Sequence, residues 1–206
     1  MQKVISTTVY TFDELSEAAK EKARDWYREG NNDDTFWSET VIDDAKTIGA
    51  LIGIDIKNVW FSGFWSQGDG ATFDASFNYV EGGATKVKEY APKDEVLHAI
   101  ANDWQVLQDK EKLSGNVKQQ GRYNHSQCNR VYAHSSDDVY EFDTDDSYVR
   151  DNQEPGAEAT RILRRFMDWI YKQLEIAYEC ENSNETVDEN IIANEYTFTE
   201  SGKRFG

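Results

Sequence analysis

Residues 72–79, Thr-Phe-Asp-Ala-Ser-Phe-Asn-Tyr, alternate polar and apolar side chains and decide the fold. Every second residue from Phe73 to Tyr79 is apolar, so an extended chain has one apolar face and one polar face. A turn sequence, Gly-Asp-Gly, occupies residues 68–70, and an aromatic-rich segment, residues 58–65, precedes it. This order of strand, turn and strand predicts an antiparallel hairpin.

Other extended segments are predicted from their content of Val, Ile, Thr and aromatic residues. We expect strands at residues 3–10 and 195–199, near the two ends of the sequence, and a second hairpin at residues 116–132. The sheet should therefore contain two hairpins and the terminal strands.

Apolar side chains spaced three or four residues apart predict the helices. The first helix should follow a capping box formed by Thr11 and Glu14 and should end at Gly30. The others are expected to begin near Asp34, at Pro92, after Pro155 and near Val187.

Helices and antiparallel strands occur in blocks rather than in alternation along the chain. This order predicts an α+β fold, an antiparallel sheet packed against about four helices. No segment rich in Gly, Ser or Pro interrupts the sequence, so residues 1–206 are expected to form a single domain.

Negative charge is concentrated in two segments of a chain whose formal net charge is −17. Residues 137–154, an expected loop, contain eight acidic side chains and one basic one, and residues 175–200 contain eight acidic side chains and no Lys or Arg. Such a field repels nucleic acids and anionic membranes, and attracts basic proteins. A second interpretation, charge that serves only solubility, stays open.

Thirteen of the sixteen carboxylates of the two segments are the predicted partner-binding residues, because closely spaced negative charges can imitate DNA and occupy a basic channel. They are Asp137, Asp138, Glu141, Asp143, Asp145, Asp146, Asp151, Glu154, Glu179, Glu181, Glu185, Asp188 and Glu189. The expected partner is a basic, nucleic-acid-binding host protein rather than a nucleic acid or a membrane.

Composition favours a soluble protein of a reducing compartment. The two cysteines, Cys128 and Cys180, do not make a disulfide framework. The N-terminal residues do not resemble a signal peptide, and no apolar run approaches the ~20 residues of a membrane span.

One acidic stretch has part of the spacing of a calcium-binding loop, from Asp143 to Glu154. The position that requires Gly for a sharp turn is Tyr148, and Pro155 follows where a helix should continue. We therefore predict no metal and no cofactor.

The sequence shows no convincing catalytic arrangement. His125 and Cys128 lie three residues apart, so their side chains would face opposite sides of a strand. Residues 63–68 resemble a nucleophile elbow with one residue too many, and a strand follows instead of a helix. The chain is expected not to be an enzyme.

Cations and aromatic rings occur together in the second hairpin, at Lys118, Arg122, Tyr123, Arg130 and Tyr132. Such residues can hold single-stranded nucleic acid. Because the net charge opposes that approach, we interpret the cations as ion-pair partners of the acidic loop.

The block FSGFWSQGDGA at residues 61–71 resembles a family of bacteriophage and prophage proteins. The resemblance extends to residues 10–16, 44–49, 88–94, 166–171 and 193–199, which cover most of the chain. Members are often labelled as the N-terminal part of the antitoxin of a toxin–antitoxin stability system. The resemblance implies a phage or mobile-element origin and a role in the host cytoplasm, and it supplies no catalytic residues.

These observations predict a phage-encoded acidic protein that inhibits a host defence or nucleic-acid enzyme, of the anti-restriction or anti-CRISPR type, by nucleic-acid mimicry. Two alternatives stay open. One is an antitoxin that neutralises a partner toxin, and the other is a protein that sequesters a small nucleotide signal. An aromatic pocket beside Trp65 and the turn at residues 68–70 would favour the second alternative.

Overall fold

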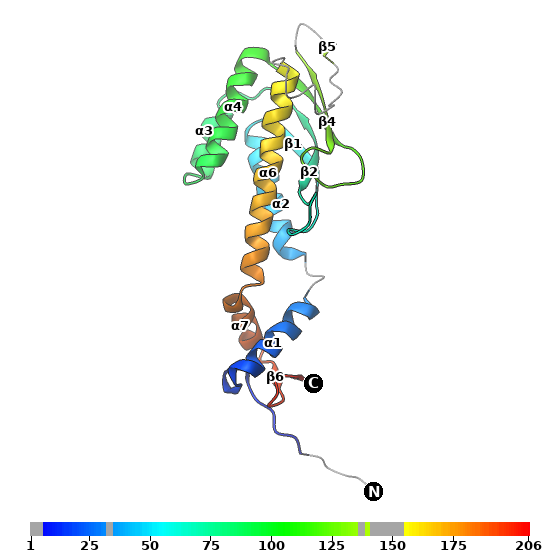
Figure 1. The fold of residues 1–206 in the computed structure, drawn as a ribbon. Coiled ribbons are helices and arrows are strands. Elements are labelled where there is room, and N and C mark those ends of the chain that lie inside the picture. Colours follow the sequence, from blue (N-terminus) through cyan, green and yellow to red (C-terminus); the bar gives the residue numbers. More distant parts are fainter. Residues whose placement is uncertain (1–5, 32–34, 136–138, 141–154) are drawn as a thin grey trace. The chain divides into compact units, whose positions relative to one another are not determined.

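The structure, a computed structural model, describes residues 6–31, 35–135, 139–140 and 155–206 (Figure 1). In chain order its elements are η1 (Phe12–Glu14), α1 (Glu17–Gly30), α2 (Phe36–Leu51), β1 (Ile54–Phe61), β2 (Ala71–Phe77), α3 (Gly83–Tyr90), α4 (Glu95–Glu111), β3 (Ser114–Gln119), β4 (Asn129–His134), β5 (Val139–Tyr140), α6 (Pro155–Glu181), α7 (Asn184–Ala193), β6 (Thr197–Phe198) and β7 (Arg204–Phe205). Helices combined with antiparallel sheets confirm the predicted α+β class.

The chain divides into two compact units by its internal contacts. Unit 1 comprises Met1–Ser38 and Ile176–Gly206, and unit 2 comprises Glu39–Glu175. The residues of α2 and of α6 are each shared between the two units. Such a division does not test whether either unit folds alone, so the single domain stays a prediction.

Unit 2 is built on an antiparallel sheet with the order β1-β2-β3-β4-β5. The alternation is confirmed from Phe73 to Phe77 of β2, where both rings are fully buried and Asp74 and Ser76 are partly exposed, but Thr72 is buried as well and the strand ends before Asn78 and Tyr79. Phe73 packs edge-on against Phe166 of α6, and Phe77 packs edge-on against Trp104 of α4, with ring centroids 6.0 and 5.4 Å apart. Burial of each such ring contributes about 2–3 kcal/mol, so β2 forms the centre of this core.

The first hairpin is shorter at its turn than predicted. β1 ends at Phe61 instead of continuing to Trp65, and it begins earlier, at Ile54. Residues between Phe61 and Ala71 form a loop, because the side chain of Asp69 accepts the backbone N–H groups of Trp65 and Ser66. The second predicted hairpin is confirmed as β3 and β4.

The predicted helix starts of unit 2 are confirmed for α6 but not for α4. α4 begins at Glu95 instead of Pro92, because Asp94 accepts a hydrogen bond from the Leu97 N–H at 2.8 Å. α3, which packs beside α4 (Figure 1), was not predicted. α6 does begin at Pro155, as expected.

Two residues of the expected acidic loop, Val139 and Tyr140, instead form β5 against β4. A short strand escapes pattern recognition because two residues show no periodicity. The rest of residues 137–154 lies outside the described residues.

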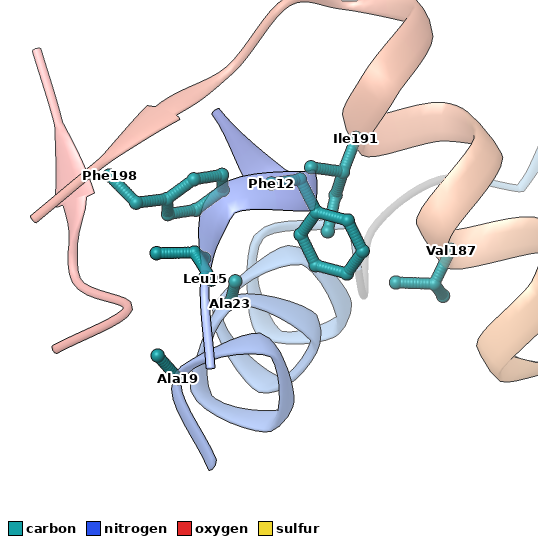
Figure 2. Close-up of a cluster of buried hydrophobic side chains, with 7 residues drawn as sticks. All are labelled: Phe12, Leu15, Ala19, Ala23, Val187, Ile191 and Phe198. Carbon is teal, nitrogen blue, oxygen red and sulfur yellow. The ribbon is translucent and has the colours of Figure 1, made fainter. Parts of the chain in front are cut away.

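Unit 1 packs segments from both ends of the chain around a small apolar cluster (Figure 2). Its buried members are Phe12, Leu15, Ala19, Ala23, Val187, Ile191 and Phe198. The cluster therefore joins η1 and α1 to α7 and β6.

The terminal strands do not join the main sheet, which corrects the prediction. β6 pairs with β7 in a separate two-stranded sheet, and Tyr10 exchanges two backbone hydrogen bonds of 2.9 Å with Phe198. Residues 6–9 are not in a strand, and residues 3–5 lie outside the described part. The apolar cluster holds Phe198 on the helices of unit 1, and this packing decides the pairing.

The predicted capping box forms, with the Thr11 N–H donating to Glu14 at 2.8 Å, but it caps only the short helix η1. Leu15 then adopts an extended conformation and is buried in the cluster. A second N-cap, Ser16, precedes α1. The segment predicted as one helix therefore forms two, η1 and α1.

Candidate functional site

The described part of the chain contains some of the predicted partner-binding carboxylates, all in unit 1. Glu179 and Glu181 lie near the end of α6, and Glu185, Asp188 and Glu189 lie on α7. The eight predicted residues between positions 137 and 154, and the calcium-loop spacing considered there, lie outside the described residues.

Asp188 makes an ion pair inside unit 1. Its two carboxylate oxygens accept hydrogen bonds of 2.6 Å from Nε and Nη2 of Arg24, which is 8% exposed. This pairing raises the pKa of Arg24 above its ordinary value. Asp188 therefore fastens α7 to α1, and its role in partner binding stays a prediction.

Glu179, Glu185 and Glu189 are exposed, and none forms an ion pair with any residue in the described segments. Glu185 and Glu189 are four residues apart on α7 and share one side of the helix. On α1, by contrast, three of the four acidic residues, Glu17, Glu21 and Asp25, each pair with a base three residues later.

The loop between β1 and β2 holds an exposed tryptophan in a fixed backbone geometry. Trp65 is 78% exposed. Asp69 Oδ2 accepts the N–H of Trp65 at 3.1 Å and that of Ser66 at 2.7 Å. Ser62 and Gly70 close the base of the loop, with the Ser62 N–H donating to the Gly70 carbonyl at 3.0 Å.

Aromatic rings pack against one another within and beside this loop. Phe64 stacks on Phe61 and on Tyr171 of α6, with centroids 6.4 and 5.4 Å apart. The Tyr171 hydroxyl donates to the Gly63 carbonyl at 2.8 Å. Burial, with the nearby charges of Asp69 and Glu175, raises the pKa of Tyr171, so the hydroxyl keeps its proton and remains a donor.

A second exposed ring lies on the loop between β3 and β4. Tyr123 is 57% exposed, and the Arg122 guanidinium lies 5.5 Å from its centroid. Asn124 in the same loop donates to the Phe61 carbonyl at 3.0 Å. The two loops therefore touch, although Trp65 lines neither of the two pockets described below.

His125 and Cys128 belong to a tight turn rather than to a strand, since the Cys128 N–H donates to the His125 carbonyl at 2.8 Å. Within the described segments, no group of three or more His, Cys, Asp or Glu side chains could hold a metal ion. None of the helices described is both long enough and apolar enough to cross a membrane.

Two pockets have no counterpart in the sequence prediction. The pocket in unit 1 has a volume of about 580 Å³ and is lined by Lys22, Trp26, Ser201, Gly202, Lys203 and Arg204. The pocket in unit 2 has a volume of about 360 Å³ and has side chains of both charges, including Asp94, Asp168, Arg165 and Lys172. Residues about 180 positions apart in sequence form the first, and no local pattern could have revealed it.

Comparison with protein families gives one match, a model described as a domain of unknown function, DUF8835, over residues 37–184. The chain belongs to this family. No curated protein and no solved structure matches the chain. The DUF8835 match includes all of unit 2 and the loop that carries Trp65, whereas α1 and the two-stranded sheet lie outside it.

Proposed function

We propose that this DUF8835 protein is an acidic, non-enzymatic binding protein of a phage or prophage, which inhibits a defence or nucleic-acid enzyme in the host cytoplasm. The observation that carries the proposal is the set of exposed carboxylates Glu179, Glu185 and Glu189, which form no ion pair within the described part of the chain. The phage origin is supported by the resemblance carried by the block at residues 61–71 and by the further segments given with it.

Unpaired carboxylates act on a partner more strongly than paired ones. A cation within 4 Å cancels much of the field of a carboxylate, as Lys46 does for Asp43 in unit 2. Residues 175–200 contain no Lys or Arg, so the charge there is not neutralised from within the segment. Such a surface speeds the approach of a basic protein and makes its binding sensitive to salt.

On unit 2, the exposed ring of Trp65 offers a second contact for a partner, one that is apolar and independent of the carboxylates of unit 1. Tryptophan is enriched among residues that dominate binding energy at protein interfaces. The hydrogen bonds that Asp69 accepts and that Tyr171 donates fix the loop before binding, so little conformational entropy is lost on association. This arrangement supports a protein partner rather than a purely solubilising surface.

Affinity purification of the tagged full chain from a bacterial host, followed by an activity assay of the captured protein, tests the proposal. We expect a basic nucleic-acid enzyme that loses activity on addition of the chain. Recovery of no nucleic-acid-binding protein, or capture without inhibition, would overturn the proposal.

A charge-matched pair of variants tests the role of the carboxylates. The variant E179Q/E185Q/E189Q should recover at least roughly tenfold less partner, because each charge contact is worth on the order of 0.5 kcal/mol. The control E17Q/D43N/D55N has the same net charge and alters carboxylates that pair with Lys20, Lys46 and Lys57. It should recover as much partner as the unaltered chain.

A further inference from the structure

The pocket of unit 1 has the opposite charge to the chain that surrounds it. The sequence of unit 1 contains 15 acidic and seven basic residues. Yet the charged side chains that line the pocket are Lys22, Lys203 and Arg204, and no carboxylate lines it. Three cations in an acidic unit select a negatively charged ligand.

Glycine at position 202 allows the last turn of the chain to form one wall of this pocket. Gly202 has a φ of +83°, and a Cβ there would lie 2.1 Å from the Ala19 carbonyl oxygen of α1. Thr199 holds the turn, accepting the Gly202 N–H at 2.9 Å on its carbonyl and the Lys203 N–H at 3.2 Å on its hydroxyl. The turn therefore packs directly against the helix that carries Lys22 and Trp26.

Aromatic rings hold the guanidinium of Arg204 in place. Its central carbon lies 4.8 Å from the ring centroid of Tyr196 and 5.6 Å from that of Trp26. Its Nη1 also donates to the Thr197 carbonyl at 3.1 Å. A guanidinium fixed in this way loses little freedom when it binds an anion.

The two lysines of the pocket are exposed and can contact a ligand. Lys22 and Lys203 are exposed, and neither forms an ion pair with any residue that the structure describes. Every other lysine or arginine of α1, namely Lys20, Arg24 and Arg28, pairs with a carboxylate.

We propose that this pocket binds a small phosphate-bearing ligand of mononucleotide size. The phosphate would contact Lys22, Lys203 and Arg204, since ammonium and guanidinium groups are preferred phosphate donors. The volume of about 580 Å³ exceeds the needs of a bare phosphate and falls in the range of ligand pockets. Trp26 provides an aromatic wall for the base.

The pocket shares no residue with the proposed partner surface, and its ligand does not depend on the inhibition of an enzyme. It locates a nucleotide-sequestering activity in unit 1 instead of beside Trp65. The DUF8835 match does not include the pocket residues, so the site belongs to this chain rather than to the family domain.

Calorimetric titration of the full chain with AMP, inorganic phosphate and citrate at low salt tests the inference. We expect AMP to bind more tightly than phosphate, and citrate to bind least, because it offers neither a phosphate nor a ring. The variant K22Q/K203Q should bind AMP at least roughly tenfold more weakly, since hydrogen bonds to charged groups are the strong ones.

A matched variant controls for net charge. Lys86 and Lys93 are exposed in unit 2. The variant K86Q/K93Q therefore removes two positive charges, as K22Q/K203Q does, but from residues that do not line the pocket. It should bind AMP as the unaltered chain does, and circular dichroism should show both variants folded. Any one of three results would overturn the inference: no AMP binding at millimolar concentration, equal binding by both variants, or citrate or phosphate that binds as tightly as AMP.

Discussion

Both units contain ion pairs and also, among the described residues, charged side chains without one. In unit 2, cations such as Lys46, Lys118 and Arg165 each lie within 4 Å of a carboxylate. In unit 1, Glu17 and Asp25 are paired in the same way, whereas the exposed carboxylates Glu179, Glu185 and Glu189 and the pocket residues Lys22 and Lys203 form no ion pair with any described residue. Although the net charge is −17, side chains of both positive and negative charge therefore remain available to ligands in unit 1.

The cores of the units differ. Unit 2 buries large rings, among them Phe73, Phe77 and Trp104, on a sheet. Unit 1 has a small cluster with two alanines, and it adds the ion pair of Arg24 with Asp188. We infer that apolar burial dominates the stability of unit 2, whereas unit 1 depends measurably on one ion pair.

Trp104→Ala should have the largest effect. The side chain is 2% exposed, and its indole N–H donates to the Ile52 carbonyl at 2.9 Å. Truncation should lower the free energy of unfolding by about 3–5 kcal/mol, measured by urea denaturation. Val106→Ala, on the exposed side of α4, should cost under about 0.5 kcal/mol; equal losses in the two variants would contradict the core assignment.

Arg24→Met should destabilise unit 1 by about 2 kcal/mol, because it keeps the aliphatic volume but leaves Asp188 half-buried without its partner. Hydrogen exchange of the amides of α1 and α7 measures this loss. Lys20→Met, which breaks only a surface pair with Glu17, should change exchange little. If the amides of β2 lose as much protection as those of α1, the separation of the two units is wrong.

Tyr171→Phe should cost about 1 kcal/mol by removing the hydrogen bond to Gly63. The folded state raises the pKa of Tyr171, so this contribution is fully present below the unfolded pKa of about 10 and is lost as the pH rises through the folded value. Denaturation of both proteins between pH 8 and 11 measures it. A difference in stability that does not shrink with rising pH would argue against the hydrogen bond.

Glu189→Lys should have the smallest effect on stability and should increase it. A lysine four residues after Glu185 replaces a like-charge pair with an attractive one, worth about 0.3–0.5 kcal/mol. The same change should weaken the binding of a basic partner. Thermal denaturation and the recovery of partner measure the two effects, and unchanged recovery would favour charge as a device for solubility.

Much of the fold could be predicted, because its elements have strong local signals. The alternation from Phe73 to Phe77 defines β2, and the apolar stripe that includes Phe166 and Trp169 defines α6. Two of the failures occurred where a side-chain hydrogen bond overrides propensity. Aromatic residues 61–65 favour a strand, yet Asp69 captures the backbone there, and Asp94 rather than Pro92 decides where α4 begins.

The candidate sites were predictable only in part. Runs of charge in the sequence indicate the carboxylates of α7, but not that Asp188 is held by Arg24, 164 positions away. The basic pocket depends on Gly202 packing on α1, a contact between the two ends of the chain. Single-sequence patterns extend over about 20 residues and cannot show such contacts.

The most direct test of the central claim is the affinity for the captured host enzyme, measured from low to high salt for the chain, for E179Q/E185Q/E189Q and for E17Q/D43N/D55N. We expect the affinity to fall steeply with salt for the chain and for the control variant. For E179Q/E185Q/E189Q we expect a weaker affinity and a shallower salt dependence. An affinity that salt does not change, or identical behaviour of the two variants, would contradict it.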